Sequence, residues 1–221
     1  DFCLSRGLGD VYKRQVHFLI GRDGGITQHC PIDRQVSHAF QPHNDRSVGI
    51  ELDNAMYGIY AKQQKWPSEA IPLKWTPKYK KRGGYLTPTS KQLASLYKVV
   101  TWVHKKSPTV PLTVPGQQKG KFFFSSSPGP KARPQNQFYN LQGMIPHLWG
   151  IQAGIINEKT GRPHQGHGDG LFPELYLYLR FNLKLGHKAA YERAKKVFKI
   201  LGTGKKPYWW STDPEGLKPR T

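Results

Sequence analysis

The sequence predicts a small mixed α/β domain that carries long surface insertions. Short apolar runs typical of strands come first, and segments with helical spacing of apolar residues follow and interleave with them. The chain has 221 residues, of which 37% are hydrophobic, so it can bury a real core. No apolar run approaches the roughly 18 residues that a membrane span requires.

The first expected elements are strands. Residues Val16–Ile20 form an apolar run that predicts a buried strand. The turn-forming residues 21–25 (GRDGG) follow, and Ile26–Cys30 can return as a second strand, which completes a hairpin. Ser47–Leu52 (SVGIEL) predicts a further strand.

Helices are expected later in the chain. Leu93, Leu96, Val100 and Val103 are spaced three to four residues apart, and Gln92 lies three after Thr89, as in a capping box. A second helix is expected over 172–185, and a third over 187–201 that ends at Gly202.

The remaining segments are expected to be irregular. About 57–86 is rich in Lys, Trp, Tyr and Pro, which indicates a surface insertion, and 108–140 is rich in Pro, Gly, Ser and Lys, which indicates a loop. The domain would then span 16–202, and 203–221 would be a basic, frayed tail.

The net charge of +20 predicts a polyanionic neighbour, which could be nucleic acid, an acidic membrane surface or an anionic cell wall. Two cysteines, Cys3 and Cys30, are too few for a disulfide framework or a four-cysteine zinc site. Any metal would therefore be held by His and carboxylate side chains.

Residues 1–15 join abruptly to the first strand. The segment Ser5–Gln15 (SRGLGDVYKRQ) can be back-translated into a string that resembles a transposon-based sequencing adapter read in frame. We therefore expect 1–15 to be artefactual and the natural N-terminus, with any signal peptide, to be missing. Without the three basic and two acidic residues of this segment the charge is still +19.

The block HFLIGRDGGITQHCPIDRQVSHA, followed by NDRSVGIELDN, resembles the zinc-dependent type-2 N-acetylmuramoyl-L-alanine amidases, a family that includes phage lysozyme-like amidases and peptidoglycan recognition proteins. The resemblance is close over Val16–Asn54 and resumes at Ser90–Lys105 and Gly161–Arg180. It implies a central mixed sheet flanked by helices, with one zinc ion over the sheet. It also implies cleavage of the amide that joins muramic acid to L-alanine.

Four residues of this block have expected roles. By the resemblance, Glu51 is the acidic general base; the residues alone leave open a buried, functional carboxylate or an edge-strand Glu that faces water. His38 would contact the substrate or orient the catalytic carboxylate, although Ser37 replaces the usual Trp beside it. His17 is expected to be a sheet-core histidine, and Asn54 could hydrogen-bond the substrate peptide or a turn.

The stretch 162–170 (RPHQGHGDG) is the expected metal loop. By the resemblance, Asp169 is the last zinc ligand and His167 helps to hold the oxyanion, and residues two apart on an extended segment point the same way. His164 is the expected second ligand, with His147 as the alternative; a solvated Gly-rich loop is the alternative for the whole cluster. The first His ligand would lie upstream of Val16, so we expect the chain as written to be inactive and its natural parent to be active.

Two other functions remain open. A peptidoglycan-binding module without activity would keep the groove and lack the metal. A nucleic-acid-binding protein is suggested by the charge and by the segment KWTPKYKKRGGY, although no named nucleic-acid motif occurs. The expected partners of the amidase are peptidoglycan or muropeptides, with anionic wall polymers as further partners, which would place the protein at the cell envelope, outside the cell or in a phage-delivered particle.

Overall fold

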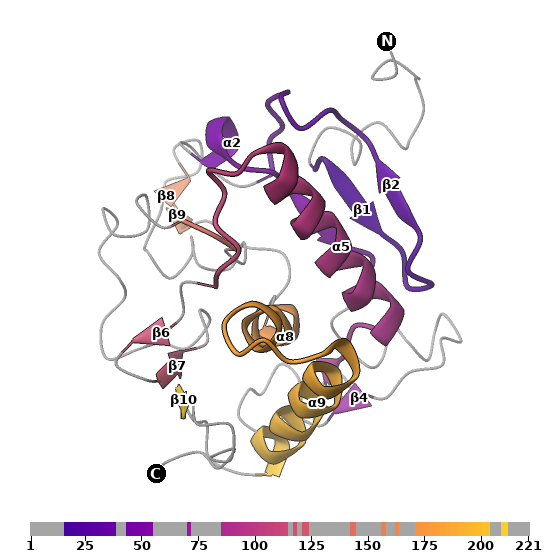
Figure 1. Cartoon of the computed structure of the whole chain (residues 1–221), viewed down its shortest axis with the longest axis vertical. Coiled ribbons are helices and arrows are strands. Elements are labelled where there is room, and N and C mark those ends of the chain that lie inside the picture. Colours follow the sequence, from indigo (N-terminus) through magenta and orange to yellow (C-terminus); the bar gives the residue numbers. More distant parts are fainter. Residues whose placement is uncertain are drawn as a thin grey trace. The chain divides into compact units, whose positions relative to one another are not determined.

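The computed structural model describes residues 16–38, 43–54, 70–71, 85–114, 117–118, 121–123, 142–144, 156–157, 162–163, 171–203 and 209–211 (Figure 1). The chain divides into two compact units, which are described separately. The first comprises Asp1–Asp53 and Pro88–Pro111, and the second Asn54–Thr87 and Leu112–Thr221. In the described residues no helix is long and apolar enough to cross a membrane.

The described part of the first unit contains a three-stranded mixed sheet of order β2-β1-β3. Strand β1 (Phe18–Ile20) pairs antiparallel with β2 (Ile26–Gln28) and parallel with β3 (Ile50–Leu52). The predicted hairpin and the predicted later strand are thereby confirmed, as is the mixed α/β character. A short helix, α2 (His43–Arg46), precedes β3 and was not predicted.

The β1–β2 turn depends on glycine. The amide of Gly21 donates to the carbonyl of Gly25 at 2.8 Å, and the amide of Gly25 donates to Asp23 Oδ1 at 2.8 Å. Gly24 has φ of +90°, and a Cβ there would lie 3.1 Å from the carbonyl oxygen of Lys91. The turn therefore needs glycine both for its left-handed backbone and for the close approach of the following helix.

Helix α5 (Ser90–Lys106) begins at the predicted capping box. Thr89 Oγ1 accepts from the Gln92 amide at 3.0 Å, and the Thr89 amide donates to Gln92 Oε1 at 3.1 Å. The buried Gln92 side chain also donates to the carbonyls of Ile20 and Asp53, at 3.2 and 3.0 Å. These bonds tie the helix start to the ends of β1 and β3.

The sheet has two different faces. Phe18 and Ile20 are buried, and Phe18 contacts Trp102 of α5, so this face packs under the helix. Because side chains alternate along a strand, Leu19 points to the opposite face, where its register partner on β3 is Glu51. Glu51 therefore lies on the face that α5 does not cover.

The described residues of the second unit contain the two C-terminal helices and three small strand groups. Helix α8 (Leu171–Phe181) packs on α9 (His187–Thr203) through Phe172, whose ring centroid is 5.0 Å from that of Phe198. The strands pair as β4 (Ala70–Ile71) with β5 (Tyr85–Leu86), β8 (Ile156–Asn157) with β9 (Arg162–Pro163), and β7 (Lys121–Phe123) with both β6 (Gln117–Gln118) and β10 (Trp209–Ser211).

Several predicted boundaries in this unit were wrong. Helix α9 continues through Gly202 to Thr203, and α8 ends at Phe181 rather than at 185, after which Lys184 adopts a positive φ of 58°. The segment 108–140, predicted as a loop, contains β6 and β7, and the predicted frayed tail contains β10. Strands β4 and β5 lie within the predicted insertion 57–86.

Candidate functional site

Glu51 lies in the middle of β3, at the edge of the described sheet, and its side chain is exposed. Of the two alternatives that the sequence left open, the buried carboxylate is therefore wrong, and the exposure agrees with an edge-strand Glu that faces water. An exposed carboxylate on the sheet face opposite α5 can be reached by a substrate. Its catalytic role stays a prediction.

His17 is a core residue, as predicted, with a side chain only 1% exposed. Its Nδ1 accepts a hydrogen bond from the Gly49 amide at 3.0 Å, and its Nε2 lies 2.8 Å from the carbonyl oxygen of Arg34, to which it donates. An amide can only donate and a carbonyl can only accept, so the ring is held as the neutral Nε2–H tautomer. Burial lowers the pKa of His17, in the same direction.

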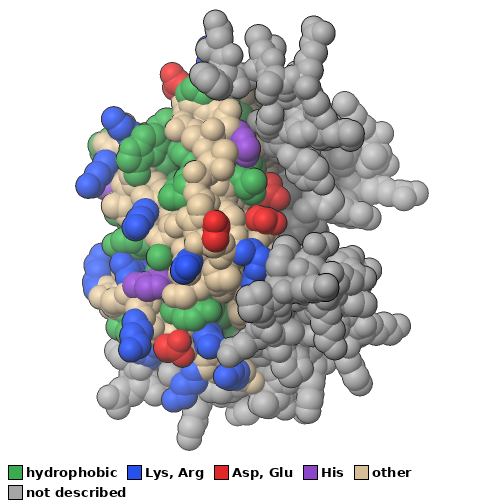
Figure 2. All heavy atoms as spheres, turned by 90° about the vertical axis from the view of Figure 1, so that its right-hand side faces the viewer, with side chains coloured by type: hydrophobic (Ala, Val, Ile, Leu, Met, Phe, Trp, Pro, Cys, Tyr) green, Lys and Arg blue, Asp and Glu red, His purple; other side chains and the backbone are tan. Residues whose placement is uncertain are grey.

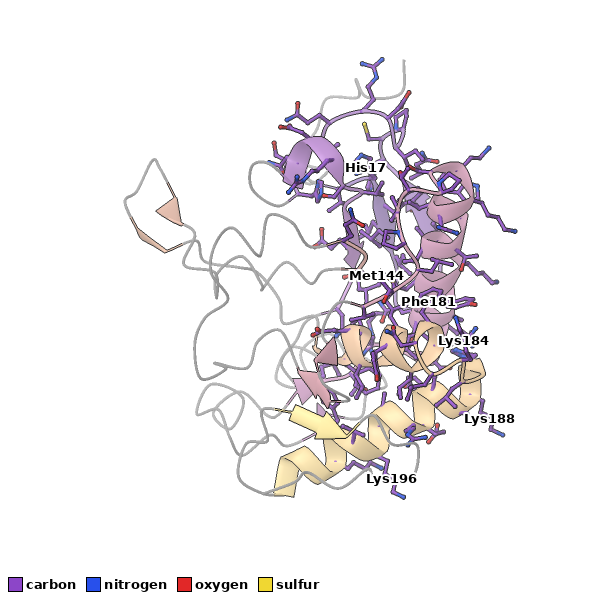
Figure 3. The ribbon with its side chains drawn as sticks, turned by 60° about the vertical axis from the view of Figure 1, so that its left-hand side comes forward. His17, Met144, Phe181, Lys184, Lys188 and Lys196 are labelled. Atoms are coloured by element: carbon purple, nitrogen blue, oxygen red, sulfur yellow. The ribbon has the colours of Figure 1, made fainter. Side chains whose placement is uncertain are left out.

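His17 thus fixes two segments and has no ring nitrogen left for a metal. It lies beside the strands of the sheet (Figure 3). It joins Arg34, in the loop, to Gly49, which directly precedes β3. The two hydrogen bonds therefore fix the backbone at both places.

His38 lies next to His17, with ring centroids 5.7 Å apart in an edge-to-face arrangement. Its Nδ1 lies 2.9 Å from the carbonyl of Val36, to which it donates, and its Nε2 lies 2.7 Å from Ser47 Oγ. The Ser47 hydroxyl can donate to a neutral ring or accept from a charged one, so His38 can gain or lose a proton at Nε2 without losing either contact.

Gly49 makes room for His38. A Cβ at Gly49 would lie 2.5 Å from His38 Cγ and 2.6 Å from its Cβ, far inside van der Waals contact. The glycine of the VGIE segment is therefore a packing requirement of the histidine beside it.

Ser47 is a site residue that the sequence analysis did not single out. Its sequence signal was weak: a serine at the start of a predicted strand, nine residues after the histidine that it contacts. The short helix α2 lies between the two residues in the sequence.

Asn54 belongs to the second unit, where its side-chain amide donates to the carbonyl of Leu86 at 2.9 Å. Leu86 lies in strand β5, so the observed partner is not the turn that was the alternative to the substrate peptide. A role in substrate binding stays a prediction.

The expected metal loop falls outside the described residues. His147, His164, His167 and Asp169 all lie there, and of the stretch 162–170 only Arg162–Pro163 is described, as β9. In the part of the chain that the structure describes, no group of three His, Cys, Asp or Glu side chains could hold a metal ion. The structure therefore brings together His17, His38 and Ser47, and it does not test the predicted zinc ligands.

A buried carboxylate, Glu174, was also missed. It lies in the first turn of α8 and is 3% exposed, within the run FPELYLYL. A Glu inside an otherwise apolar helical run could have signalled it, because such a side chain is rarely buried without a partner.

These observations define an α/β domain with a mixed sheet, whose uncovered face carries a carboxylate and whose adjoining loop carries a positioned histidine. The model of the N-acetylmuramoyl-L-alanine amidase family matches residues 5–120, just over half of the chain. The chain belongs to this family, and the resemblance identified from its motifs is confirmed. No curated protein and no solved structure matches it.

The matched range covers the sheet, α5, and the residues Glu51 and His38. It also includes 5–15, and the assignment of that segment to an adapter stays a prediction. The metal-loop residues 162–170 lie beyond the matched range.

Proposed function

We propose that the protein is a zinc-dependent hydrolase of the amide between muramic acid and L-alanine in peptidoglycan or muropeptides. The observation that supports the proposal is the family match over the sheet, joined with an exposed Glu51 on the face that α5 leaves uncovered. An acyl-amide hydrolase needs a proton acceptor that its bulky glycopeptide substrate can reach.

The described residues do not supply a zinc site. His17 and His38 use both ring nitrogens in hydrogen bonds, and no other suitable group occurs in the described ranges. The ligands we propose are His164, with His147 as the alternative, and Asp169. A zinc ion there would supply a water of lowered pKa and would polarise the scissile carbonyl.

The proposed roles of the other residues follow from their chemistry. Glu51 accepts the proton of the attacking water and passes it to the leaving nitrogen. His167 would stabilise the oxyanion as a hydrogen-bond donor. His38 is held by Val36 and Ser47 and would orient the substrate or the Glu51 carboxylate.

We also propose that a first His ligand belongs to the natural sequence in place of residues 1–15. A zinc ion with two of three protein ligands binds much more weakly, so the 221-residue chain should be inactive. A restored chain, in which the upstream sequence of the parental gene replaces 1–15, should be active.

The test compares the two chains on purified peptidoglycan. The assay measures release of new L-alanine amino groups and, in parallel, bound zinc after dialysis. The restored chain should expose new L-alanine amino groups and hold stoichiometric zinc. Glu51→Gln should lower kcat about 10²-fold or more with zinc retained, because a general base contributes about this factor.

Matched controls separate site effects from charge effects. Glu192→Gln removes the same charge from an exposed position on α9 and should leave turnover unchanged. Full turnover after Asp169→Ala would refute the zinc proposal. Tight binding to peptidoglycan with no new L-alanine amino groups would favour the non-catalytic binding module instead.

A further inference from the structure

The outer surface of α5 combines lysines with a partly exposed tryptophan. Lys91, Lys98 and Lys105 are exposed and lie seven residues apart, so they follow one side of the helix at intervals of about 10.5 Å. Trp102 lies between the last two and is 40% exposed, which is unusual for so large an aromatic side chain.

The charge of this helix is not balanced along its own length. Its sequence, SKQLASLYKVVTWVHKK, contains four lysines and no acidic residue, although acid–base pairs four residues apart are common on solvated helices. Figure 2 shows Lys and Arg side chains over much of the described surface on the face it presents, with fewer Asp and Glu among them.

A shallow groove lies along the same side. Tyr97, Lys98, Thr101, Trp102 and Lys105 line a hollow of about 250 Å³. The Trp102 ring is held in place at an edge-to-face distance of 5.9 Å from Phe18, and Lys106 Nζ lies 5.9 Å from its centroid. The aromatic surface is therefore fixed by the core and edged by positive charge.

We propose that the groove formed by Tyr97, Lys98, Thr101, Trp102 and Lys105, extended along the helix to Lys91, binds a single anionic wall polymer with a phosphodiester backbone. A row of lysines at regular intervals complements one chain of regularly spaced phosphates. The tryptophan offers a flat apolar surface for the sugar or polyol units between them. The choice of the wall as the source of the polymer rests on the proposed function.

A single row of lysines suits a single chain better than a nucleic-acid duplex. A helix that enters the major groove of DNA contacts phosphates on both sides of a groove about 12 Å wide and presents base-reading side chains between them. The opposite side of α5 is buried on β1, so the helix cannot enter a groove in this way.

The surface is separate from the candidate catalytic face. The groove lies on the outside of α5, whereas Glu51 lies on the sheet face that α5 does not cover. Binding at the groove therefore leaves the catalytic face free, and it would retain the enzyme at the wall between cleavage events.

Sedimentation of the full 221-residue chain with purified walls tests the proposal without any need for hydrolysis. One sample retains its phosphodiester polymers, and the other has lost them by hydrofluoric acid treatment. The polymer-bearing walls should bind at least tenfold more tightly, and the logarithm of affinity should fall steeply with the logarithm of salt concentration.

The variant K91Q/K98Q/K105Q should bind polymer-bearing walls about a hundredfold more weakly, since each lysine near an anionic surface contributes about fivefold. Its matched control is K188Q/K196Q/K199Q, which removes equal charge from exposed positions of α9; Lys188 and Lys196 project away from that helix (Figure 3). Trp102→Leu keeps an apolar contact with Phe18 and should weaken binding about fivefold or more.

Circular dichroism should show that the folded state is retained in every variant. An equal loss of affinity in the α9 control would overturn the proposal, because binding would then follow total charge. Equal binding to walls with and without the polymer would overturn it as well. So would binding to a single-stranded oligonucleotide that is tighter than binding to walls and is weakened by K91Q/K98Q/K105Q.

Discussion

Replacing His17 by leucine tests the assignment of this residue as a neutral structural histidine. Leucine has a similar size and preserves apolar packing, but it removes the acceptor for the Gly49 amide and the donor to the Arg34 carbonyl. The change therefore removes hydrogen bonding while it leaves most of the buried volume filled.

The expected cost follows from the two lost contacts. The buried Gly49 amide loses its acceptor, at about 1–3 kcal/mol. Arg34 is exposed, so its carbonyl can turn to water, and this loss together with imperfect packing adds roughly 1 kcal/mol. The free energy of unfolding should fall by about 2–4 kcal/mol, which lowers the urea midpoint by roughly 1 M or more.

The pH dependence gives a second, independent measure. Burial lowers the pKa of His17 below its ordinary value of 6.5, so the unfolded chain takes up a proton that the folded chain does not. The contribution of His17 to the free energy of unfolding is fully present at pH values above 6.5. It decreases as the pH falls below 6.5, by at most about 1.4 kcal/mol per pH unit. His187 contributes in the same direction, because burial and then the Arg180 charge lower its pKa.

The difference between wild type and variant isolates His17, because His187 is common to both. Urea unfolding followed by circular dichroism at pH 7.5, 6.5 and 5.5 measures both effects, above the range in which most carboxylates titrate. A cost below about 0.5 kcal/mol for His17→Leu, or an unchanged pH dependence between pH 6.5 and 5.5, would show that His17 is not a neutral hydrogen-bonded core residue.

Three further substitutions test the site and its supporting helix. Gly49→Ala places a Cβ against His38 and should cost about 1–3 kcal/mol in urea unfolding, with loss of amide hydrolysis in the restored chain; unchanged stability would contradict the close approach. Ser47→Ala removes the hydroxyl at His38 Nε2 and should lower turnover of the restored chain severalfold and shift its pH profile, while an unshifted profile would show that the contact does not act through the His38 proton. Thr89→Ala removes the cap of α5 and should cost about 1–2 kcal/mol in urea unfolding, and unchanged stability would contradict the capping role of Thr89.

The elements predicted well from the sequence are those specified by nearby residues. The α5 capping box needs only Thr89 and Gln92, three residues apart, and the β1–β2 hairpin needs only the turn 21–25. The pairing of β7 with β10 joins segments distant in the sequence, so no local pattern predicts it.

Gly202 shows where a local signal fails. A glycine after an apolar helical run predicts a helix end, yet α9 continues through it to Thr203. A glycine inside a helix costs about 1 kcal/mol, and the helix before it buries Ala190, Ala194, Val197 and Phe198. The helix therefore ends two residues beyond the predicted end, a difference that is ordinary for a helix terminus.

The site was predictable in the part that depends on strand alternation. Once the parallel register of β1 and β3 is known, alternation places Glu51 on the face of Leu19, opposite α5. The contact of His38 with Ser47 depends on the path of the chain around α2, which the sequence does not specify.

The two neighbouring histidines differ in what the fold allows them to do. His17 accepts from an amide, so protonation of Nδ1 would set two donors against each other, and the residue must stay neutral. His38 contacts the Ser47 hydroxyl, which can either donate or accept a hydrogen bond. The contact is therefore compatible with Nε2 of His38 in its protonated or its unprotonated form. Gly49 links the two histidines. Its amide donates to His17, and its lack of a Cβ leaves the space that the His38 ring occupies. The core residue His17 therefore positions Gly49, against which the His38 ring packs. The histidine with fixed hydrogen-bond directions is thus the structural one, and the histidine that can change its protonation state is the one that contacts a hydroxyl.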